Sequence, residues 1–127
     1  MNTKGKFLWT DLTVPNAGEL KEFYKEVVGW EEHAIDMKDG EETYQDFAMM
    51  ADKETAVGGI CNQRGKNANI PPQWIPYINV TNVEESLKKA INLGGSLIHE
   101  SRKKDGSYQF VIIKDPIGAI FGLGKFD

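Results

Sequence analysis

Two side chains at matching positions of the sequence, Asp11 and Tyr77, are the first candidates for chemistry. They are 66 positions apart, and each lies in a stretch whose apolar residues predict a β-strand. A carboxylate in an apolar cavity would have a raised pKa, so Asp11 could act as a general base or anchor a cationic ligand. Alternatively, Asp11 could accept a hydrogen bond from the Tyr77 hydroxyl or from backbone amides and have only a structural role. Both interpretations stay open.

Two histidines and one cysteine are the other reactive side chains of interest. His33 and His99 are also 66 positions apart, but both fall on the strand that follows a helix. Because that strand should lie at the outer edge of its sheet, we expect two surface or edge histidines that are far apart. Cys61 has no histidine two to four residues away. A nucleophilic thiol needs a lowered pKa and an adjacent base, so we expect Cys61 to be buried and inert.

The elements that would position these residues occur twice in the chain. Three patterns recur with one spacing of 66 residues: an asparagine with a glutamate three positions later, a glycine, and a Lys-Asp-Gly run. They are typical of a helix start, a helix end and a hairpin turn, respectively. The pairs are Asn16–Glu19 and Asn82–Glu85, Gly29 and Gly95, and 38–40 and 104–106. The sequence therefore predicts an internal duplication.

Each half is predicted to form one strand, one helix and three further strands. In module one, about 5–64, the helix is expected at 17–28 and the strands near 6–14, 30–36, 42–50 and 57–63. In module two, about 73–127, the helix is expected at 83–93 and the strands near 74–81, 96–101, 107–114 and 119–125. The segment 64–72, rich in Gly, Asn and Pro, is the expected linker. The predicted fold class is α+β: one domain, 1–127, of two βαβββ modules whose sheets face each other and form a cup.

Short motifs in both halves support a family resemblance. Phe23-Tyr24 followed by Val28-Gly29-Trp30, and later Leu93-Gly94-Gly95 and Asp115-Pro116-Ile117-Gly118, resemble the vicinal oxygen chelate superfamily over nearly the whole chain. That superfamily includes glyoxalase I, extradiol dioxygenases, fosfomycin-resistance enzymes and the metal-free bleomycin-resistance proteins. In its metal-using members, His or Glu ligands come from the first and last strand of each module. The resemblance places these positions at Trp9, Cys61, Ile75 and Gly122, where only the thiol could bind a metal. The resemblance thus implies the fold without the usual metal-dependent activity, and we expect no metal and no other cofactor.

Strand alternation predicts which side chains face the cup. Leu8, Leu12, Val14, Phe47 and Met49 should face the helix, and Trp74 should pack under the helix at 83–93. Asp46, Ala48, Met50 and Ile112 should face the cup, together with the expected ligand-binding residues Trp9, Asp11, Tyr44, Cys61, Tyr77, Tyr108 and Phe110. Aromatic walls with a few polar groups suit a planar or apolar small molecule. Alternatively, the rings fill a solid core between the sheets.

Composition narrows the partners. Fifteen Lys+Arg against nineteen Asp+Glu give a net charge of −4, which disfavours nucleic acid. No apolar run approaches the roughly 20 residues of a membrane span, the start of the chain lacks a signal-peptide pattern, and one cysteine fits a reducing compartment. We therefore expect a cytoplasmic protein, homodimeric by resemblance, that binds a small aromatic or apolar molecule in a metal-free cup.

Three alternatives stay open. The first is a metal-independent enzyme of the lyase or isomerase kind that uses Asp11 with Tyr44 or Tyr77 for proton transfer. The second is a metal enzyme, of the dioxygenase kind for example, with non-standard ligands from Asp11, Asp46, Cys61 or the histidines. The third is a dimerisation or regulatory module with a filled cup.

Overall fold

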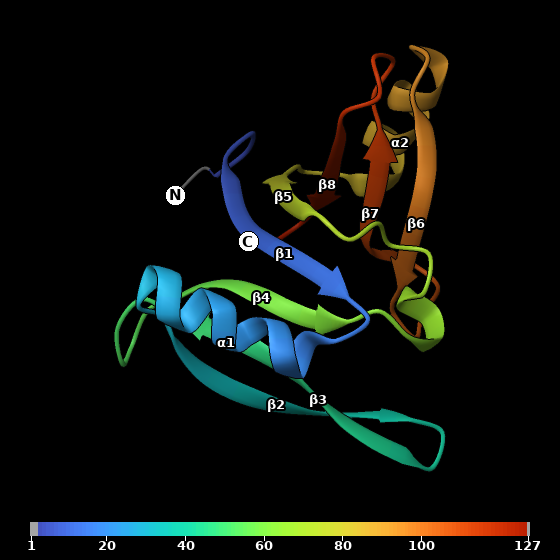
Figure 1. Ribbon diagram of the computed structural model, residues 1–127. Helices are drawn as coiled ribbons and strands as arrows, with labels where there is room; N and C mark the ends of the chain where they lie inside the picture. Colours follow the sequence, from blue (N-terminus) through green and yellow to red (C-terminus); the bar gives the residue numbers. More distant parts are fainter. Residues whose placement is uncertain (1–2, 127) are drawn as a thin grey trace. The chain divides into compact units, whose positions relative to one another are not determined.

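The computed structural model describes residues 3–126, and the chain forms two compact units (Figure 1). The first unit is Thr10–Trp74, and the second joins the start of the chain, through Trp9, to the segment from Ile75 onward. The start belongs to the second unit because the Gly5 amide donates to the Asn79 carbonyl (2.7 Å) and the Asn79 amide donates to the Lys6 carbonyl (2.9 Å). The first strand therefore begins in one unit and continues in the other.

The first unit contains a helix and most of four strands in the order β2-β3-β4-β1, in which β1 and β4 are parallel and the other pairs antiparallel. Its elements are β1 (Phe7–Val14), α1 (Ala17–Val28), β2 (Glu31–Asp39), β3 (Glu42–Met50), β4 (Ala56–Asn62) and a short 3-10 turn at Gly65–Asn67. One sheet face and α1 bury a shared apolar core of Leu12, Val14, Ala17, Phe47, Met49 and Ile60. The prediction that Leu12, Val14, Phe47 and Met49 face the helix is therefore confirmed.

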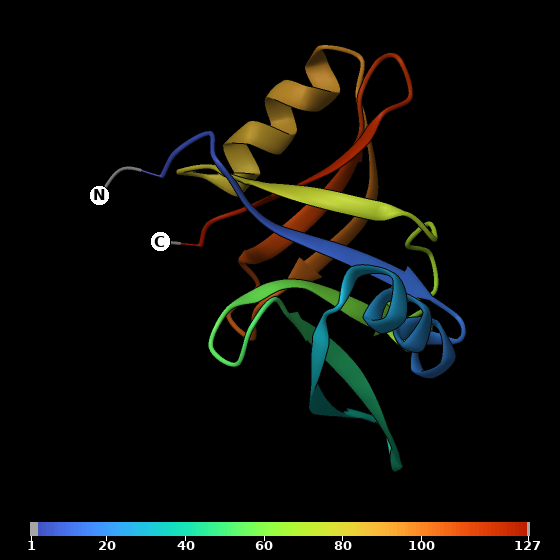
Figure 2. The same cartoon turned by 60° about the vertical axis from the view of Figure 1, so that its left-hand side comes forward.

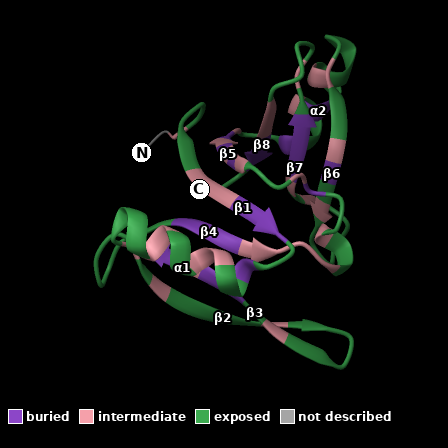
Figure 3. Ribbon diagram, in the orientation of Figure 1, coloured by how far each residue is buried: buried purple, intermediate pink, exposed green. Residues whose placement is uncertain are grey.

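The second unit repeats this arrangement, with strand order β5-β8-β7-β6 and β5 and β8 parallel. Its elements are β5 (Trp74–Asn79), α2 (Val83–Asn92), β6 (Ser96–Arg102), β7 (Tyr108–Lys114) and β8 (Ile120–Gly124). Figure 2 shows α2 along one face of these strands, and Figure 3 shows the buried stretches of β7 and β8. The core beneath α2 consists of Val83, Leu87, Val111, Ile113 and Leu123. Both predicted βαβββ modules are therefore present.

The helix ends follow the predicted pattern only in part. Asn82 Oδ1 accepts the Glu85 amide (3.0 Å) as an N-cap, but the Asn16 side chain makes no capping hydrogen bond. Gly29 ends α1 in the left-handed region at φ 86°, as expected. After α2 the left-handed residue is Gly94, at φ 99°, so the prediction for Gly95 is wrong by one position. Gly95 instead lies where an added Cβ would be 3.0 Å from the Ala90 carbonyl oxygen.

Two residues, Tyr108 and Leu8, do not lie where strand alternation predicted them. The β6–β7 ladder shifts register between Ser101 and Arg102, and Tyr108 packs against the core beneath α2. The prediction that Tyr108 shares the face of Phe110 is therefore wrong, because a β-bulge reverses the alternation. Leu8 is also not part of the core beneath α1, since 38% of its surface is exposed.

Trp74 packs under the first helix, so our prediction that it packs under the second helix is wrong. Its Nε1 donates to the Tyr24 hydroxyl (2.9 Å), and its ring contacts those of Tyr24 and Trp30. The indole thereby anchors the end of the linker to the core beneath α1. Among residues 3–126, neither helix is long and apolar enough to cross a membrane.

Candidate ligand-binding faces

The sheet face away from α1 has a floor of small residues in the first unit. Strand pairing aligns four residues in one row across this face: His33 on β2 with Ala48 on β3, Ala48 with Gly59 on β4, and Gly59 with Asp11 on β1. Because neighbouring strands are about 4.8 Å apart, the row spans roughly 14 Å between its ends. Its middle carries only a methyl group and a hydrogen, so the row itself has no bulky side chain there; Ala48 is half-buried and Gly59 is buried.

Asp11 has a defined place beside this floor. A Cβ at Gly59 would collide with Asp11 Oδ1, which shows that the carboxylate leans over the glycine. A larger residue at position 59 would therefore displace the carboxylate. Position 59 is therefore a glycine because the Asp11 side chain comes close to its backbone.

Cys61 lies next to the floor, on the same face by strand alternation, paired with Thr13. Burial raises the pKa of the Cys61 thiol well above its ordinary value, and the charges of Asp11 and Asp46 raise it further. The group therefore stays a neutral thiol at physiological pH and is a poor nucleophile. The expected low reactivity agrees with this raised pKa, but Cys61 is half-buried and not buried as predicted. The effect of the two charges shows that Asp11, Asp46 and Cys61 are near one another.

Asp46 and Tyr44 complete this face along β3. Asp46 is buried, and its Oδ1 accepts the Asn62 backbone amide and the Asn62 side-chain amide, both at 2.9 Å. Burial also raises the pKa of Tyr44, and the Arg64 guanidinium lies 4.3 Å from the centre of the Tyr44 ring. Asp46 therefore has a structural role in holding β4, whereas Tyr44 forms a packed aromatic border.

The second unit aligns a matching row with larger side chains. His99 pairs with Ile112, Ile112 with Gly122, and Gly122 with Tyr77. A Cβ at Gly122 would collide with the Tyr77 ring, so this ring covers the glycine. The Phe110 ring packs edge-on against Tyr77 at 5.5 Å between centroids. This face is therefore filled by the protein's own rings.

His99 is buried, with 6% of its surface exposed, so the expectation of two surface histidines holds only for His33. Both histidines lie on edge strands, as predicted. A register shift between Leu97 and His99 brings the imidazole onto the face of Phe110, whose ring centre is 5.8 Å away. Burial lowers the pKa of His99, and the charge of Glu100 partly opposes this effect.

The positions chosen by resemblance for metal ligands are not all equivalent. Gly122 pairs with Tyr77, so its counterpart is Gly59, which pairs with Asp11. Cys61 therefore lies two residues beyond the position that is equivalent to Gly122. The remaining two positions, Trp9 and Ile75, are half-buried and buried, respectively. These side chains do not fit a metal ion, and across residues 3–126 no three His, Cys, Asp or Glu side chains are grouped so that they could hold one.

Of the predicted ligand-binding residues, the structure brings Asp11, Tyr44 and Cys61 to one face of the first unit and Tyr77 and Phe110 to one face of the second. The expected pairing of Asp11 with Tyr77 stays a prediction, since they belong to different units. Strand alternation placed Ala48 on this face, but sequence reasoning missed Gly59 and the row that it forms with Ala48.

Comparisons with known proteins agree with this architecture. The glyoxalase-like domain family matches residues 9–123. "Putative glyoxylase CFP32" of Mycobacterium bovis and of Mycobacterium tuberculosis are each 26% identical to this chain over 125 residues, covering 98% of it and 46% of the relative. The chain thus spans about half the length of the curated relatives it matches.

Two solved structures illustrate the shared fold. Methylmalonyl-CoA epimerase from Mycobacterium tuberculosis has a TM-score of 0.59 at 13% identity, covering 100% of this chain and 93% of the other. A hypothetical protein, BH1468 from Bacillus halodurans C-125, has a TM-score of 0.59 at 11% identity, covering 97% and 95%. At such low identity the similarity shows the fold alone.

Proposed function

Since the chain belongs to the glyoxalase-like domain family, we propose that it binds a small aromatic or apolar molecule on the open face of its first unit. The observation that carries this proposal is the row from His33 to Asp11, in which Ala48 and Gly59 leave a floor between two polar ends. The corresponding face of the second unit is covered by Tyr77 and Phe110. The two faces share one scaffold, so the small residues are a property of this sequence and not of the fold.

The chemistry of the ligand follows from the groups around the floor. A planar apolar body can lie on Ala48 and Gly59, and the Asp11 carboxylate can orient a positively charged or hydrogen-bond-donating group. The thiol of Cys61 stays neutral beside it and adds an apolar contact. No metal ion takes part in this binding mode, which relies on side chains of the chain alone.

Substitution of the floor tests the proposal directly. Ala48→Ile copies the residue that the second unit has in the same row, Ile112, and should abolish binding while the fold persists. Ala34→Ile is the matched control, because Ala34 is exposed on β2 and its row partner Phe47 faces the core. We would titrate both variants and the unmodified protein with benzylamine and tryptamine, and with phenylacetate and indole-3-acetate, by calorimetry and thermal shift.

The amines should raise the unfolding midpoint of the unmodified protein and of Ala34→Ile, and the carboxylates should not. Asp11→Asn should weaken the amines by about tenfold, the loss typical of a charge-assisted hydrogen bond. If Ala48→Ile binds the amines as tightly as the unmodified protein, the floor is not the binding site.

Proton transfer at Asp11 is the second candidate, favoured by the position of the carboxylate beside an open floor. A carboxylate there could remove a proton from a carbon next to a carbonyl group without a metal. Structural neighbours named as methylmalonyl-CoA epimerases suggest methylmalonyl-CoA as the first compound to test. Exchange of its acidic C–H for deuterium in heavy water, lost in Asp11→Asn, would support this activity, and no exchange would exclude it for that substrate.

Assembly as a homodimer remains a proposal that follows from the resemblance. Sedimentation equilibrium of the purified chain measures its mass in solution. A mass of about 28 kDa, twice that of the 14.2 kDa chain, would support it. A mass that stays at the single-chain value over a wide concentration range would exclude it.

A further inference from the structure

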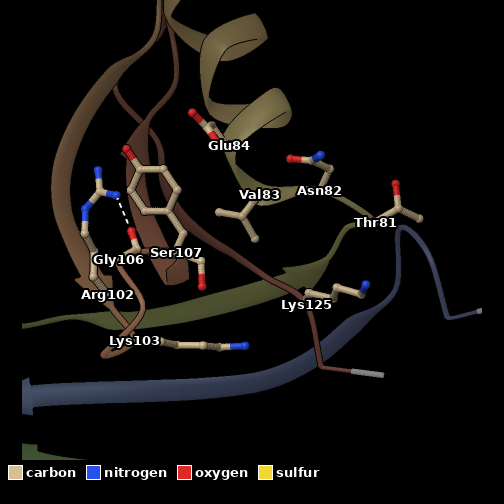
Figure 4. A pocket seen from close by; sticks show the side chains of 10 residues that line it. Thr81, Asn82, Val83, Glu84, Arg102, Lys103, Gly106, Ser107 and Lys125 are labelled. Carbon is tan, nitrogen blue, oxygen red and sulfur yellow. Dashed lines mark hydrogen bonds between the residues drawn. The ribbon is translucent and has the colours of Figure 1, made fainter.

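A cavity of about 240 Å³ lies on the helix side of the second unit, beside the start of α2 (Figure 4). It is separate from the face proposed above to bind an apolar ligand, because that face belongs to the first unit. The residues that matter for its chemistry are Thr81, Arg102, Lys103, Ser107, Tyr108 and Lys125. Tyr108, which we had expected to face a cup with Phe110, therefore lines a cavity on the other side of its sheet.

Three positive side chains from two segments of the chain line this cavity. Arg102 ends β6, Lys103 begins the hairpin that follows, and Lys125 lies just after β8. Of the described residues that line it, only Glu84 carries a carboxylate, although the chain as a whole has a net charge of −4. Bringing like charges together raises their electrostatic energy, and a bound anion would relieve this repulsion.

The two lysines are available to such an anion. Among residues 3–126, no carboxylate lies within ion-pair distance of the Nζ atom of Lys103 or Lys125, although the charge of Lys103 does act on Asp105. In the view of Figure 4 both lysines lie on the side of Val83 away from Glu84. Lysine ammonium groups bind phosphate and carboxylate as compact charges with three donors.

Arg102 and Tyr108 form a fixed wall for the cavity. Arg102 Nη1 donates to the Gly106 carbonyl at 2.6 Å, and its Nη2 lies 3.1 Å from Glu100 Oε2. The guanidinium carbon is 4.0 Å from the centre of the Tyr108 ring. The ion pair with Glu100 offsets part of the charge of Arg102, so the guanidinium serves mainly as a wall packed on Tyr108, and the two lysines carry the positive charge of the cavity. The site does not depend on the first turn of α2, where Asn82 already caps the Glu85 amide.

The matching hairpin of the first unit has the opposite charge. Residues 36–42 carry four carboxylates and one lysine, whereas the matching residues 102–108 carry one carboxylate and three cations. A further cation of the first unit, Arg64, lies beside this hairpin. Arg64 is paired there with Glu42 at 2.6 Å and with Asp39 at 3.4 Å. Because the region around this hairpin has a paired arginine in the first unit, and two lysines without an ion pair among residues 3–126 in the second, the charge of the cavity is not a consequence of the fold.

We propose that this cavity binds a small molecule that carries a doubly charged oxyanion, either a phosphate monoester or a dicarboxylate. The cavity is smaller than most sites for drug-sized ligands, so the charged group and a few further atoms would fill it. Lys103 and Lys125 contact the oxygens, and Arg102 lies behind them against Tyr108.

The test compares two variants that remove the same charge from different places. Lys103→Gln with Lys125→Gln changes the cavity, whereas Lys53→Gln with Lys66→Gln changes exposed lysines of the first unit. Each variant and the unmodified protein would be titrated with phenyl phosphate, inorganic phosphate and succinate at constant ionic strength and pH 8, followed by backbone amide NMR shifts. Circular dichroism would confirm that each variant is folded.

We expect saturable binding of phenyl phosphate or succinate to the unmodified protein and to the first-unit variant, with shifts centred on residues 81–84 and 102–108. The cavity variant should bind at least tenfold more weakly. The preferred compound identifies the charged group as phosphate or carboxylate. Absence of saturable binding by all three compounds would overturn the proposal, and so would an equal loss in both variants, since that would indicate a nonspecific effect of net charge.

Discussion

The two units contain the same row of residues with different contents. Each row begins with a histidine on the edge strand of its unit. It continues with a residue of the next strand and a glycine, and it ends with a side chain of the first strand of the module. In the first unit the second and fourth members are Ala48 and Asp11, and in the second unit they are Ile112 and Tyr77. One row therefore has small residues between a histidine and a carboxylate, whereas the other has bulky apolar side chains in the matching places.

This difference shows how a duplicated fold can divide its tasks. The glycine is present in both rows because a first-strand side chain lies over it in each, so the backbone requirement is shared. Filling one face contributes apolar burial and hence stability. Leaving the other face open gives up that burial and creates a place for a ligand. The second unit should then depend more strongly on its row for folding than the first.

The largest expected change in the free energy of unfolding comes from replacing the glycine of each row, Gly122 or Gly59, by alanine. Gly122→Ala should lower the free energy of unfolding by about 3 kcal/mol, because the Tyr77 ring beneath it is buried and confined by Phe110 and cannot move away. Gly59→Ala should cost about 1 kcal/mol, since the short Asp11 side chain can rotate. Urea unfolding measures both values.

A second pair of variants tests the cause of that effect. In a Tyr77→Ala background the ring is absent, so Gly122→Ala should add little further destabilisation. Additive costs would show that the ring is not responsible. A cost for Gly59→Ala as large as that for Gly122→Ala would contradict the difference between the two rows.

Trp74 distinguishes the cores beneath the two helices. The core beneath α1 contains the buried Phe47 and has the rings of Tyr24, Trp30 and Trp74 packed against it, whereas the core beneath α2 is aliphatic and has the rings of Tyr108 and Phe121 packed against it. Trp74→Phe should lower the free energy of unfolding by about 1.5 kcal/mol through loss of the hydrogen bond to Tyr24 and some packing. Tyr24→Phe should cost about 1 kcal/mol, and the double variant less than the sum. Full additivity in chemical unfolding would show that the hydrogen bond contributes nothing.

The helix caps give a smaller and equally direct contrast. Asn82→Ala should destabilise the protein by about 1 kcal/mol, because it leaves the Glu85 amide without its side-chain acceptor. Asn16→Ala should change stability by no more than a few tenths of a kcal/mol, since that side chain makes no capping hydrogen bond. Thermal unfolding followed by circular dichroism measures both. Equal losses would mean that the two helix starts are capped alike.

The sequence was sufficient for the architecture because the duplicated turns and helix ends are local features. Gly29, Gly40 and Gly106 have positive φ as the repeat predicts, and all ten helices and strands of the two modules were expected within a few residues. Periodicity failed where pairing was irregular. The bulges that reposition His99 and Tyr108 depend on which residues the partner strand offers, and no local pattern encodes that.

The candidate sites were predicted less completely for the same reason. Asp11, Tyr44 and Cys61 were found because reactive or aromatic side chains attract notice in a sequence. Ala48 was predicted to face the cup, but the floor that it forms with Gly59 was missed, because a row of small residues becomes visible only when the strands are paired. The cationic cavity needed three segments far apart in the sequence, with Arg102 and Lys125 separated by a whole hairpin and β8.

The ends of the two rows differ in a way that pH can reveal. His99 is buried beside Phe110, and burial lowers the pKa of His99, so the folded protein takes up this proton less readily than the unfolded chain. In the unfolded chain histidine titrates near 6.5. This contribution to stability is therefore fully present above about pH 6.5, and the free energy of unfolding should fall as the pH drops below that value towards the folded pKa.

His99→Gln should remove this dependence of stability on pH, whereas His33→Gln, at the exposed end of the other row, should keep it. Urea unfolding midpoints between pH 7.5 and 5.0 measure this dependence. Carboxylates such as Glu32 and Asp115 keep their charge over that range, because their hydrogen-bond donors lower their pKa values. A slope that persists in His99→Gln and disappears in His33→Gln would reverse the assignment and place the buried, pH-sensitive end in the first unit.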